Sequence, residues 1–377
     1  TFTNCSAAKQ GGAIKCGTQS ARADSTLDND MNISYCTFIE CKAYEGGALY
    51  FQDGDEEGDE ETVIQYCTFD KCLGTAGSAV YCRSYKFEMS HSIFKNSIQT
   101  EESQEDYEIE SFLFVLHDED GISTNIVNCT FINNEQNIEF HSFNAAPSIS
   151  TREEQINSVT FSKCYFTQNN QASNGADTIL DLQYIQAELV TFDTCLFEDN
   201  YGRCLSNEGE MTSNTIINNC TFDKNHGGYG CAIYSIKSLS SPDTPYLTVK
   251  DCTFSNNKAT FYSSARGVVC ADTLSITFSG VNYFINNEVR KESEDPEAAG
   301  SNGGSLLIMQ EDPAEYEVSN LVFTNSYSDG YGGAMTVFAG DLEGKDETVP
   351  RSLFITINNC TFTNCSAAKQ GGAIKCG

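Results

Sequence analysis

Sulfur chemistry is the first possibility that the sequence raises, because 18 of its 377 residues are cysteine. Residues 5–364, a stretch of 360 residues, hold 16 of them, and an even number permits complete pairing. Short separations recur and predict disulfide bonds at Cys5–Cys16, Cys72–Cys82, Cys195–Cys204 and Cys220–Cys231. The alternative is a set of buried free thiols stacked in columns. Zinc is not expected, since no C-x-x-C pair occurs and the chain has four histidines.

Asparagine side chains offer a second chemistry, N-linked glycosylation. Six asparagines precede x-Ser/Thr: Asn4, Asn32, Asn128, Asn219, Asn359 and Asn364. The Asn, Ser and Thr content gives roughly this number of matches by chance. In the recurring sequence N-C-T-F, the alternation of a strand points the asparagine outward. Glycosylation is therefore expected only in a eukaryotic host that secretes the protein.

Carboxylates gather in four short segments. These acidic segments are residues 53–61, 101–110, 292–297 and 341–347. Calcium accepts six to eight oxygen ligands in flexible geometry, so it could bridge such carboxylates, but no segment matches a defined calcium-binding loop. A solvated acidic fringe is the favoured interpretation, with calcium or glycans as possible small partners.

Catalytic chemistry finds little support in the sequence. A hydrolase or lyase needs paired carboxylates, or a cation site beside Arg or Lys, on one strand face. Here the acidic residues gather in loops, and His91, His117, His141 and His226 have no recurrent partner. We therefore expect no catalytic residue, no metal site, no cofactor and no enzyme.

Net charge and cysteine content restrict the partners and the location. With 53 acidic and 22 basic side chains, the formal charge of −31 argues against nucleic acid as a partner. The apolar run of residues 112–116 is too short to span a membrane. The many cysteines favour an oxidising environment, so a secreted protein, extracellular or at the cell surface, is expected.

The two ends of the chain carry the same sequence. Residues 1–17 and residues 361–377 both read TFTNCSAAKQGGAIKCG, an identity of 17 residues at an offset of 360. The favoured interpretation is a tandem array with a long period of 360 residues, of which this chain holds one period plus the overlap. The alternative is a chain whose ends were duplicated.

A shorter repeat lies inside the long period. Its anchor is a phenylalanine, often in the tripeptide CTF, and the twelve anchors are Phe2, Phe38, Phe69, Phe94, Phe131, Phe166, Phe197, Phe222, Phe254, Phe284, Phe323 and Phe362. They lie 25 to 39 residues apart, and eleven intervals fill the 360 residues. We define a repeat as the residues from one anchor to the next, and a column as the equivalent residues of successive repeats.

The residues around each anchor predict strands and turns. In residues 216–222, Cys220 and Phe222 share one face while Asn219 and Thr221 share the other, which indicates a half-buried strand. The column three residues after the anchor predicts a polar turn ladder, with asparagine at Asn134, Asn169, Asn200, Asn225, Asn257 and Asn287. Glycine motifs such as Gly46-Gly47-Ala48-Leu49 predict a tight corner. In the repeat of Phe94, residues 112–116 are expected to replace this motif.

The combination F-x-x-N and G-G-A-[ILV] resembles the repeats of the chlamydial polymorphic outer membrane proteins. The resemblance extends over almost the whole chain and implies a right-handed parallel β-helix of the pectin-lyase type. We therefore expect an all-β fold, one continuous solenoid over residues 1–377, with about eleven coils per long period. The chlamydial proteins end in an outer-membrane barrel, and no segment of this chain matches one.

Two functions follow from this fold. The favoured one is a structural extracellular fibre, sheath or stalk, in which the solenoid continues end to end, so that its main partner is itself. The alternative is a surface adhesin or carbohydrate-binding protein, with recognition carried by long loops such as residues 101–125 and 288–304. An aromatic-lined groove would favour the adhesin, and uniformly polar faces would favour the stalk.

Overall fold

The structure is a computed structural model. It describes residues 1–17, 30–52, 61–74, 76–84, 86–97, 111–117, 123–134, 137–142, 158–169, 178–181, 189–209, 214–237, 246–261, 266–272, 275–291, 301–310, 315–339 and 354–376. Over these ranges the chain is all-β, with 40 strands and no helix, as the sequence predicted. No described segment is a helix long and apolar enough to cross a membrane.

The chain divides into two compact units. Unit 1 comprises Thr1–Gln171 and Ile179–Thr191, and unit 2 comprises Ala172–Thr178 and Phe192–Gly377. Each unit has its own stack of parallel strands. The expectation of one continuous solenoid concerns how the units join, and it stays a prediction.

Sheet 1 holds the anchoring phenylalanines. In unit 1 its strands are β1 (Phe2–Thr3), β4 (Thr37–Ile39), β7 (Thr68–Asp70), β10 (Ile93–Lys95), β13 (Thr130–Ile132) and β16 (Tyr165–Thr167). In unit 2 they are β19 (Leu196–Glu198), β22 (Thr221–Asp223), β26 (Thr253–Ser255), β30 (Asn282–Ile285), β34 (Leu321–Thr324) and β38 (Thr361–Thr363).

Sheet 2 follows the glycine corner. In unit 1 its strands are β2 (Ile14–Gly17), β5 (Leu49–Gln52), β8 (Val80–Arg83), β11 (Ser111–His117), β14 (Asn137–Ser142) and β17 (Thr178–Asp181). In unit 2 they are β20 (Arg203–Gly209), β24 (Ile233–Lys237), β28 (Val269–Asp272), β32 (Leu306–Gln310), β36 (Met335–Ala339) and β40 (Ile374–Cys376). Residues 112–116 lie in β11, where Leu113 pairs with Val80, the last residue of the preceding glycine motif, so they form the sheet 2 strand of this repeat and only Leu113 overlaps the motif.

Sheet 3 precedes the anchor in each repeat. In unit 1 it contains β3 (Met31–Ser34), β6 (Glu61–Gln65), β9 (Lys86–Ser90), β12 (Ser123–Val127) and β15 (Ser158–Ser162), and the boundary between the units falls inside β18 (Leu189–Asp193). In unit 2 it contains β21 (Asn214–Asn218), β25 (Tyr246–Lys250) and β29 (Ser275–Ser279), and β33 (Glu315–Ser319) pairs separately with β37 (Phe354–Asn358).

A fourth, smaller sheet occurs in unit 2. Its strands are β23 (His226–Gly227), β27 (Lys258–Phe261), β31 (Glu288–Lys291), β35 (Tyr327–Ser328) and β39 (Ser366–Ala367).

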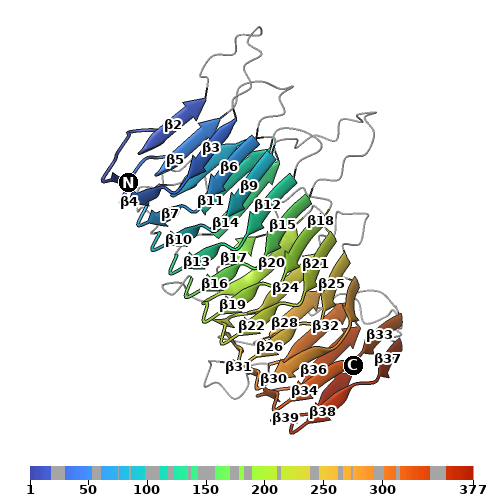
Figure 1. Ribbon diagram of the computed structural model, residues 1–377. Helices are drawn as coiled ribbons and strands as arrows, with labels where there is room; N and C mark the ends of the chain where they lie inside the picture. Colours follow the sequence, from blue (N-terminus) through green and yellow to red (C-terminus); the bar gives the residue numbers. More distant parts are fainter. Residues whose placement is uncertain are drawn as a thin grey trace, which may run out of the picture. The chain divides into compact units, whose positions relative to one another are not determined.

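Strands of one sheet come from successive repeats and run parallel. In unit 1, for example, β4 pairs with β7, and β7 pairs with β10, so strands that are three apart in chain order are neighbours in the sheet (Figure 1). The phenylalanines lie directly opposite one another, as in Phe38↔Phe69 and Phe222↔Phe254. The two longest intervals hide no extra strand layer among the described residues, because Phe323 pairs directly with both Phe284 and Phe362.

The core forms because strand residues alternate between buried and half-exposed positions. β6 shows this alternation over all five residues. The phenylalanines stack face to face, with ring centroids 5.0 Å apart for Phe38–Phe69 and 4.7 Å apart for Phe197–Phe222. A fully buried phenylalanine contributes about 1.5–3 kcal/mol from removal of its surface from water. Each unit is therefore held by a continuous apolar column that extends with every repeat.

Candidate functional site

The surfaces by which one repeat pairs with the next are the candidate functional site, and sharp turns at both ends of each sheet 1 strand shape them. Two residues after every anchor the backbone is left-handed, as in Asn133 (φ 54°) and Asn256 (φ 55°). A second left-handed column lies three residues before most anchors and includes Asn128 (φ 53°) and Asn219 (φ 52°). Asparagine tolerates this conformation better than most residues, which explains its frequency here.

The predicted asparagine ladder lies inside the fold, directly after the left-handed residue that follows each anchor by two positions. All six side chains are fully buried. In unit 2 the Asn225 amide donates to the Phe197 carbonyl at 2.9 Å and to Asn257 Oδ1 at 3.0 Å. Its own Oδ1 accepts from the backbone N–H of Asn200 at 3.1 Å. The Asn225 amide thus joins three successive repeats and satisfies backbone groups that the turn leaves without a strand partner.

Unit 1 contains an equivalent ladder, which consists of two asparagines and a serine. Asn134 donates to the Phe94 carbonyl at 3.2 Å, and Asn169 donates to the Phe131 carbonyl at 3.1 Å. The backbone N–H of Ser97 donates to Asn134 Oδ1 at 3.1 Å, so serine continues the column. The left-handed residue that makes the turn is the one directly before each ladder asparagine. The sequence interpretation did not distinguish this turn residue from the ladder asparagine.

A second buried ladder runs two residues before the anchor, where cysteine is the commonest residue. The backbone N–H of Cys195 donates to Cys220 Sγ at 3.4 Å. In the same way, the backbone N–H of Cys67 donates to Ser92 Oγ at 3.1 Å, and the backbone N–H of Cys252 donates to Asn282 Oδ1 at 2.9 Å. Cysteine, serine and asparagine are exchangeable here because each is small and can both donate and accept. Cysteine therefore acts in this column as a hydrogen-bonding residue.

The structure contains no disulfide bond among its 18 cysteines, and the disulfides expected within single repeats stay predictions. Cys72 borders sheet 1, whereas Cys82 lies in sheet 2 between Phe51 and Val115 and donates to Thr62 Oγ1 at 3.5 Å. Burial raises the pKa of the Cys82 thiol to about 12, so the thiol stays protonated.

The other three predicted pairs are likewise unbonded. The Cys195 backbone N–H donates to Cys220 Sγ of the next repeat, and the Cys204 backbone N–H donates to the Cys231 carbonyl at 3.0 Å, again between repeats. Cys5 and Cys16 are free, half-exposed and exposed respectively. The recurrent separations also follow from the ladder and strand columns of each repeat, so the spacing alone does not distinguish disulfide pairs from stacked thiols.

The six sequon asparagines all lie at the surface. Asn4, Asn32, Asn128, Asn219, Asn359 and Asn364 have exposed side chains. Five of the six also have a left-handed backbone, with Asn32 in β3 as the exception. The amides of these five are therefore presented outward on turns and that of Asn32 outward from a strand, and the alternation in N-C-T-F predicted the outward direction for Asn128, Asn219 and Asn359.

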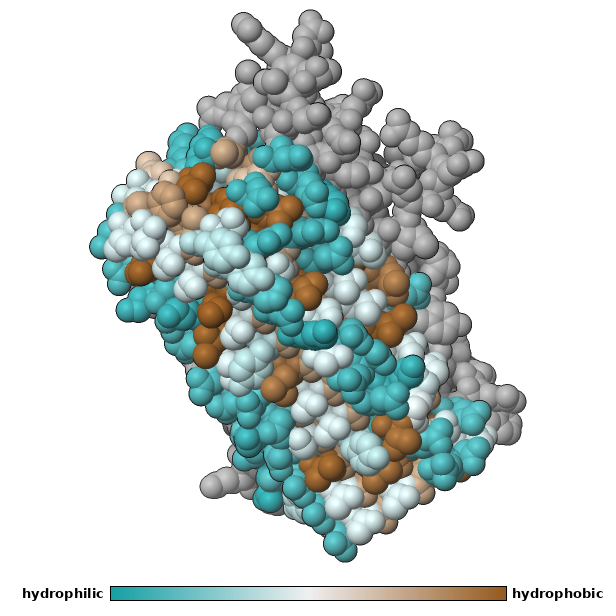
Figure 2. All heavy atoms as spheres, in the orientation of Figure 1, coloured by the Kyte–Doolittle hydropathy of each residue, from teal (hydrophilic) through white to brown (hydrophobic). Residues whose placement is uncertain are grey.

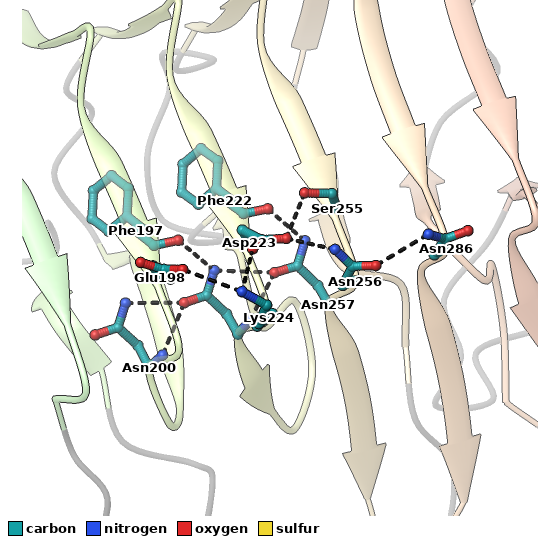
Figure 3. Close-up of polar contacts among 11 residues, drawn as sticks. Phe197, Glu198, Asn200, Phe222, Asp223, Lys224, Ser255, Asn256, Asn257 and Asn286 are labelled. Carbon is teal, nitrogen blue, oxygen red and sulfur yellow. Dashed lines mark hydrogen bonds and ion pairs between the residues drawn. The ribbon is translucent and has the colours of Figure 1, made fainter.

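A charged and polar ladder covers the outer surface of sheet 1. Lys224 Nζ lies 3.1 Å from Asp223 and 3.2 Å from Glu198 of the preceding repeat (Figure 3). The Asn256 amide donates to Asp223 at 2.7 Å. Burial alone would raise the pKa of Asp223, but hydrogen bonds from Ser255 and Asn256 and the Lys224 charge outweigh it and hold that pKa below its ordinary value.

The glycine corner makes repeats approach closely at one edge. A Cβ on Gly47 would lie 2.0 Å from the Ser78 carbonyl oxygen, and one on Gly333 would lie 2.2 Å from the Gly372 carbonyl oxygen. The N–H of each second glycine donates to the next repeat, as in Gly333 to Gly371 at 3.0 Å. Only glycine allows this backbone-to-backbone contact.

The two identical 17-residue segments pair with neighbouring repeats through opposite sides. Residues 1–17 pair with the repeat that follows, through Phe2↔Phe38 and Ile14↔Leu49. Residues 361–376 pair with the repeat that precedes, through Phe323↔Phe362 and Met335↔Ile374. The same sequence is therefore complementary to a neighbour on each of its two sides.

The described residues contain no group of three or more His, Cys, Asp or Glu side chains arranged to hold a metal ion. The four acidic segments lie outside the described residues, except for Glu61, which begins β6. His91 stacks on Tyr66 with centroids 4.7 Å apart, and burial lowers the pKa of His226. The solvated acidic fringe stays the favoured prediction, with calcium as its alternative.

No family model, curated protein or solved structure matches the chain significantly. The resemblance to the chlamydial repeats therefore stays a prediction that rests on the motifs.

Proposed function

We propose that this chain is part of a tandem-repeat, right-handed parallel β-solenoid that builds an extracellular fibre, sheath or stalk. About eleven coils would make up each long period, one for each interval between anchors. The pairing of each strand with its counterpart in the next repeat supports a solenoid. The most informative observation is that the shared 17-residue segment has a partner on each side.

Joining the two copies gives an uninterrupted stack. Gly333 donates its N–H to Gly371 at 3.0 Å, and Gly12, the equivalent of Gly372, donates to Gly46 at 3.2 Å. The anchor Phe362 stacks on Phe323 at 5.0 Å, and Phe2, its equivalent, stacks on Phe38 at 5.0 Å. If the copies are the same repeat of a longer chain, both sets of bonds are made at once, and no sheet edge is left open at that junction.

A structural role also accounts for how the polar side chains are used. The buried amides, thiols and hydroxyls bond one repeat to the next. Hydrophilic and intermediate residues cover most of the face seen in Figure 2, and hydrophobic residues form only small separate groups there. A mainly polar outside and repeating internal bonds suit a stalk whose stability grows with length.

The junction can be tested with an alanine substitution at Gly372. In this chain the nearest atom to a Cβ at Gly372 is 3.7 Å away, whereas at the equivalent Gly12 it is 2.1 Å away. Gly372→Ala should therefore change thermal stability little in this 377-residue chain. In a protein of two fused periods, where that position meets the following repeat, it should be strongly destabilising.

Gly12→Ala is the matched control and should destabilise both proteins. An equally small effect of Gly372→Ala on the 377-residue chain and on the protein of two fused periods would contradict the tandem stack, because it would mean that no following repeat packs against Gly372.

Carbohydrate binding is a second candidate, favoured by one exposed aromatic stack in unit 1. Tyr35 and Tyr66 stack with centroids 4.9 Å apart and are 78% and 45% exposed. Aromatic rings at a surface can pack against sugars. Tyr35→Ala together with Tyr66→Ala should abolish binding on a glycan array, and an array without any signal for the unaltered protein would remove this candidate.

A further inference from the structure

Inward-facing cysteines of consecutive repeats stand opposite each other across one strand spacing. Cys41 and Cys72 lie between the paired positions Ile39↔Asp70 and Lys42↔Leu73, and both are fully buried. In unit 2, Cys220 and Cys252 lie between Asn218↔Lys250 and Thr221↔Thr253 and are also buried. Each pair is therefore held in register by strand pairing on both sides.

This register suits a disulfide bond. Paired strands lie about 4.8 Å apart, which falls within the Cα separation of roughly 4.4–6.8 Å that disulfides accept. Cysteines two repeats apart, at roughly twice the strand spacing, are too distant. Only thiols of neighbouring repeats can be joined.

In the column three residues after the anchor, Cys41 and Cys72 are more weakly hydrogen-bonded than the asparagines of other repeats. Cys41 Sγ lies 3.8 Å from the Phe2 carbonyl oxygen, and Cys72 Sγ lies 3.9 Å from that of Phe38. The equivalent amide of Asn257 donates to the Phe222 carbonyl at 2.8 Å. Thiols are poor donors, so little hydrogen bonding is lost if these two are oxidised.

The two thiols also interact with each other. A hydrogen bond from Cys72 lowers the pKa of Cys41 to about 6 against the effect of burial, while the pKa of Cys72 is raised. In unit 2 a hydrogen bond from Cys220 lowers the pKa of Cys252. Thiolate is the nucleophile of disulfide exchange, so each pair combines an attacking sulfur with a thiol that stabilises it.

We propose that Cys41–Cys72 and Cys220–Cys252 are disulfide-forming pairs that link consecutive repeats when the protein meets a small-molecule disulfide. The Cys41 thiolate attacks one sulfur of the small disulfide and expels one thiolate, which leaves a mixed disulfide on Cys41. The Cys72 thiol then loses its proton and attacks Cys41 Sγ, and the second thiolate leaves. Two protein thiols are oxidised and one small disulfide is reduced to two thiols.

Burial sets when this reaction can occur. Both pairs are inaccessible in the folded repeats, so exchange takes place while the repeats stack or when they open. Cys220 and Cys252 form their bridge by the same two exchange steps. The proposal concerns neighbouring repeats within one chain and holds whether or not the chain builds a fibre.

The test is oxidative refolding followed by peptide mapping. The 377-residue protein is unfolded with reductant, refolded with reduced and oxidised glutathione, alkylated, and mapped without reduction by fragment-ion sequencing. We expect linked peptides that join Cys41 to Cys72 and Cys220 to Cys252, with two thiols per bridge protected from alkylation. Links to Cys5 or Cys195 instead, links within one repeat, or full alkylation after refolding would overturn the proposal.

Two variants keep the result interpretable. Cys41→Ser should abolish the first bridge and leave the second, and serine is accepted in this column at Ser97 and Ser326. Cys82→Ser changes another fully buried cysteine and should leave both bridges in place. Far-ultraviolet circular dichroism of each variant verifies that it has refolded. Persistence of the first bridge in Cys41→Ser would show that the assignment of its partners is wrong.

Discussion

Replacing Asn225 by alanine tests the buried amide ladder. The Asn225 side chain takes part in four hydrogen bonds with Asn200, Phe197 and Asn257, at 2.9 to 3.1 Å. A net value of about 0.5–1.5 kcal/mol per bond gives about 4 kcal/mol in all. Alanine also leaves the Asn200 N–H and the Phe197 carbonyl without these partners in a buried site. We therefore expect Asn225→Ala to lower the free energy of unfolding by about 3–5 kcal/mol.

Two further variants calibrate this loss. Asn225→Ser keeps one donor and one acceptor, so about half of the loss is expected. Asn214→Ala removes an exposed asparagine at the start of β21 and should change stability by less than about 0.5 kcal/mol. Urea unfolding followed by far-ultraviolet circular dichroism measures all three. A loss for Asn225→Ala as small as that for Asn214→Ala would refute the ladder as a source of stability.

Three other features make predictions of their own. Gly47→Ala should prevent native stacking in unit 1, because its Cβ would lie 2.0 Å from the Ser78 carbonyl oxygen, and loss of cooperative melting would reveal this. The Asp223 carboxylate stabilises the fold above its unfolded-state pKa, ordinarily 3.8, because its folded-state pKa is lower. This stabilisation is lost as pH falls through the folded-state pKa. The difference in unfolding free energy between the unaltered protein and Asp223→Asn should therefore shrink only below about pH 4. If the natural protein is glycosylated, glycosidase treatment should reduce its mass, and Asn219→Gln with Asn359→Gln should reduce that change, whereas an unchanged mass in a eukaryotic secreted sample would remove the glycan prediction.

The strand register could be predicted from the sequence because one large apolar residue marks every repeat. Phenylalanine spacing identified the strands of sheet 1, and the anchors pair directly within each unit. Period-two alternation and the glycine motif then located sheets 3 and 2. These signals are strong because burial of a phenylalanine and the absence of a Cβ at a corner leave few alternatives.

The role of the cysteines could not be read from their spacing. A ladder and a disulfide framework both place cysteines at recurrent separations and in even numbers. The signal that distinguishes them is exchange within one column, where Cys67, Ser92 and Asn282 occupy equivalent positions. Serine and asparagine cannot form disulfides, so hydrogen bonding is the property that all members of such a column share, and a disulfide can form only where two neighbouring repeats both carry cysteine. The left-handed residues were missed because Tyr35 and Lys71 are not residues typical of that conformation.

The axial repeat of the assembled natural protein tests the central claim most directly. If the long period is eleven stacked repeats, each should add about 4.8 Å, and electron microscopy or fibre diffraction should show an axial repeat of about 53 Å. The repeat should coincide with filaments or extended rods whose length rises with the number of periods. An axial repeat outside about 50–60 Å, or particles with no axial repeat, would contradict the tandem stack.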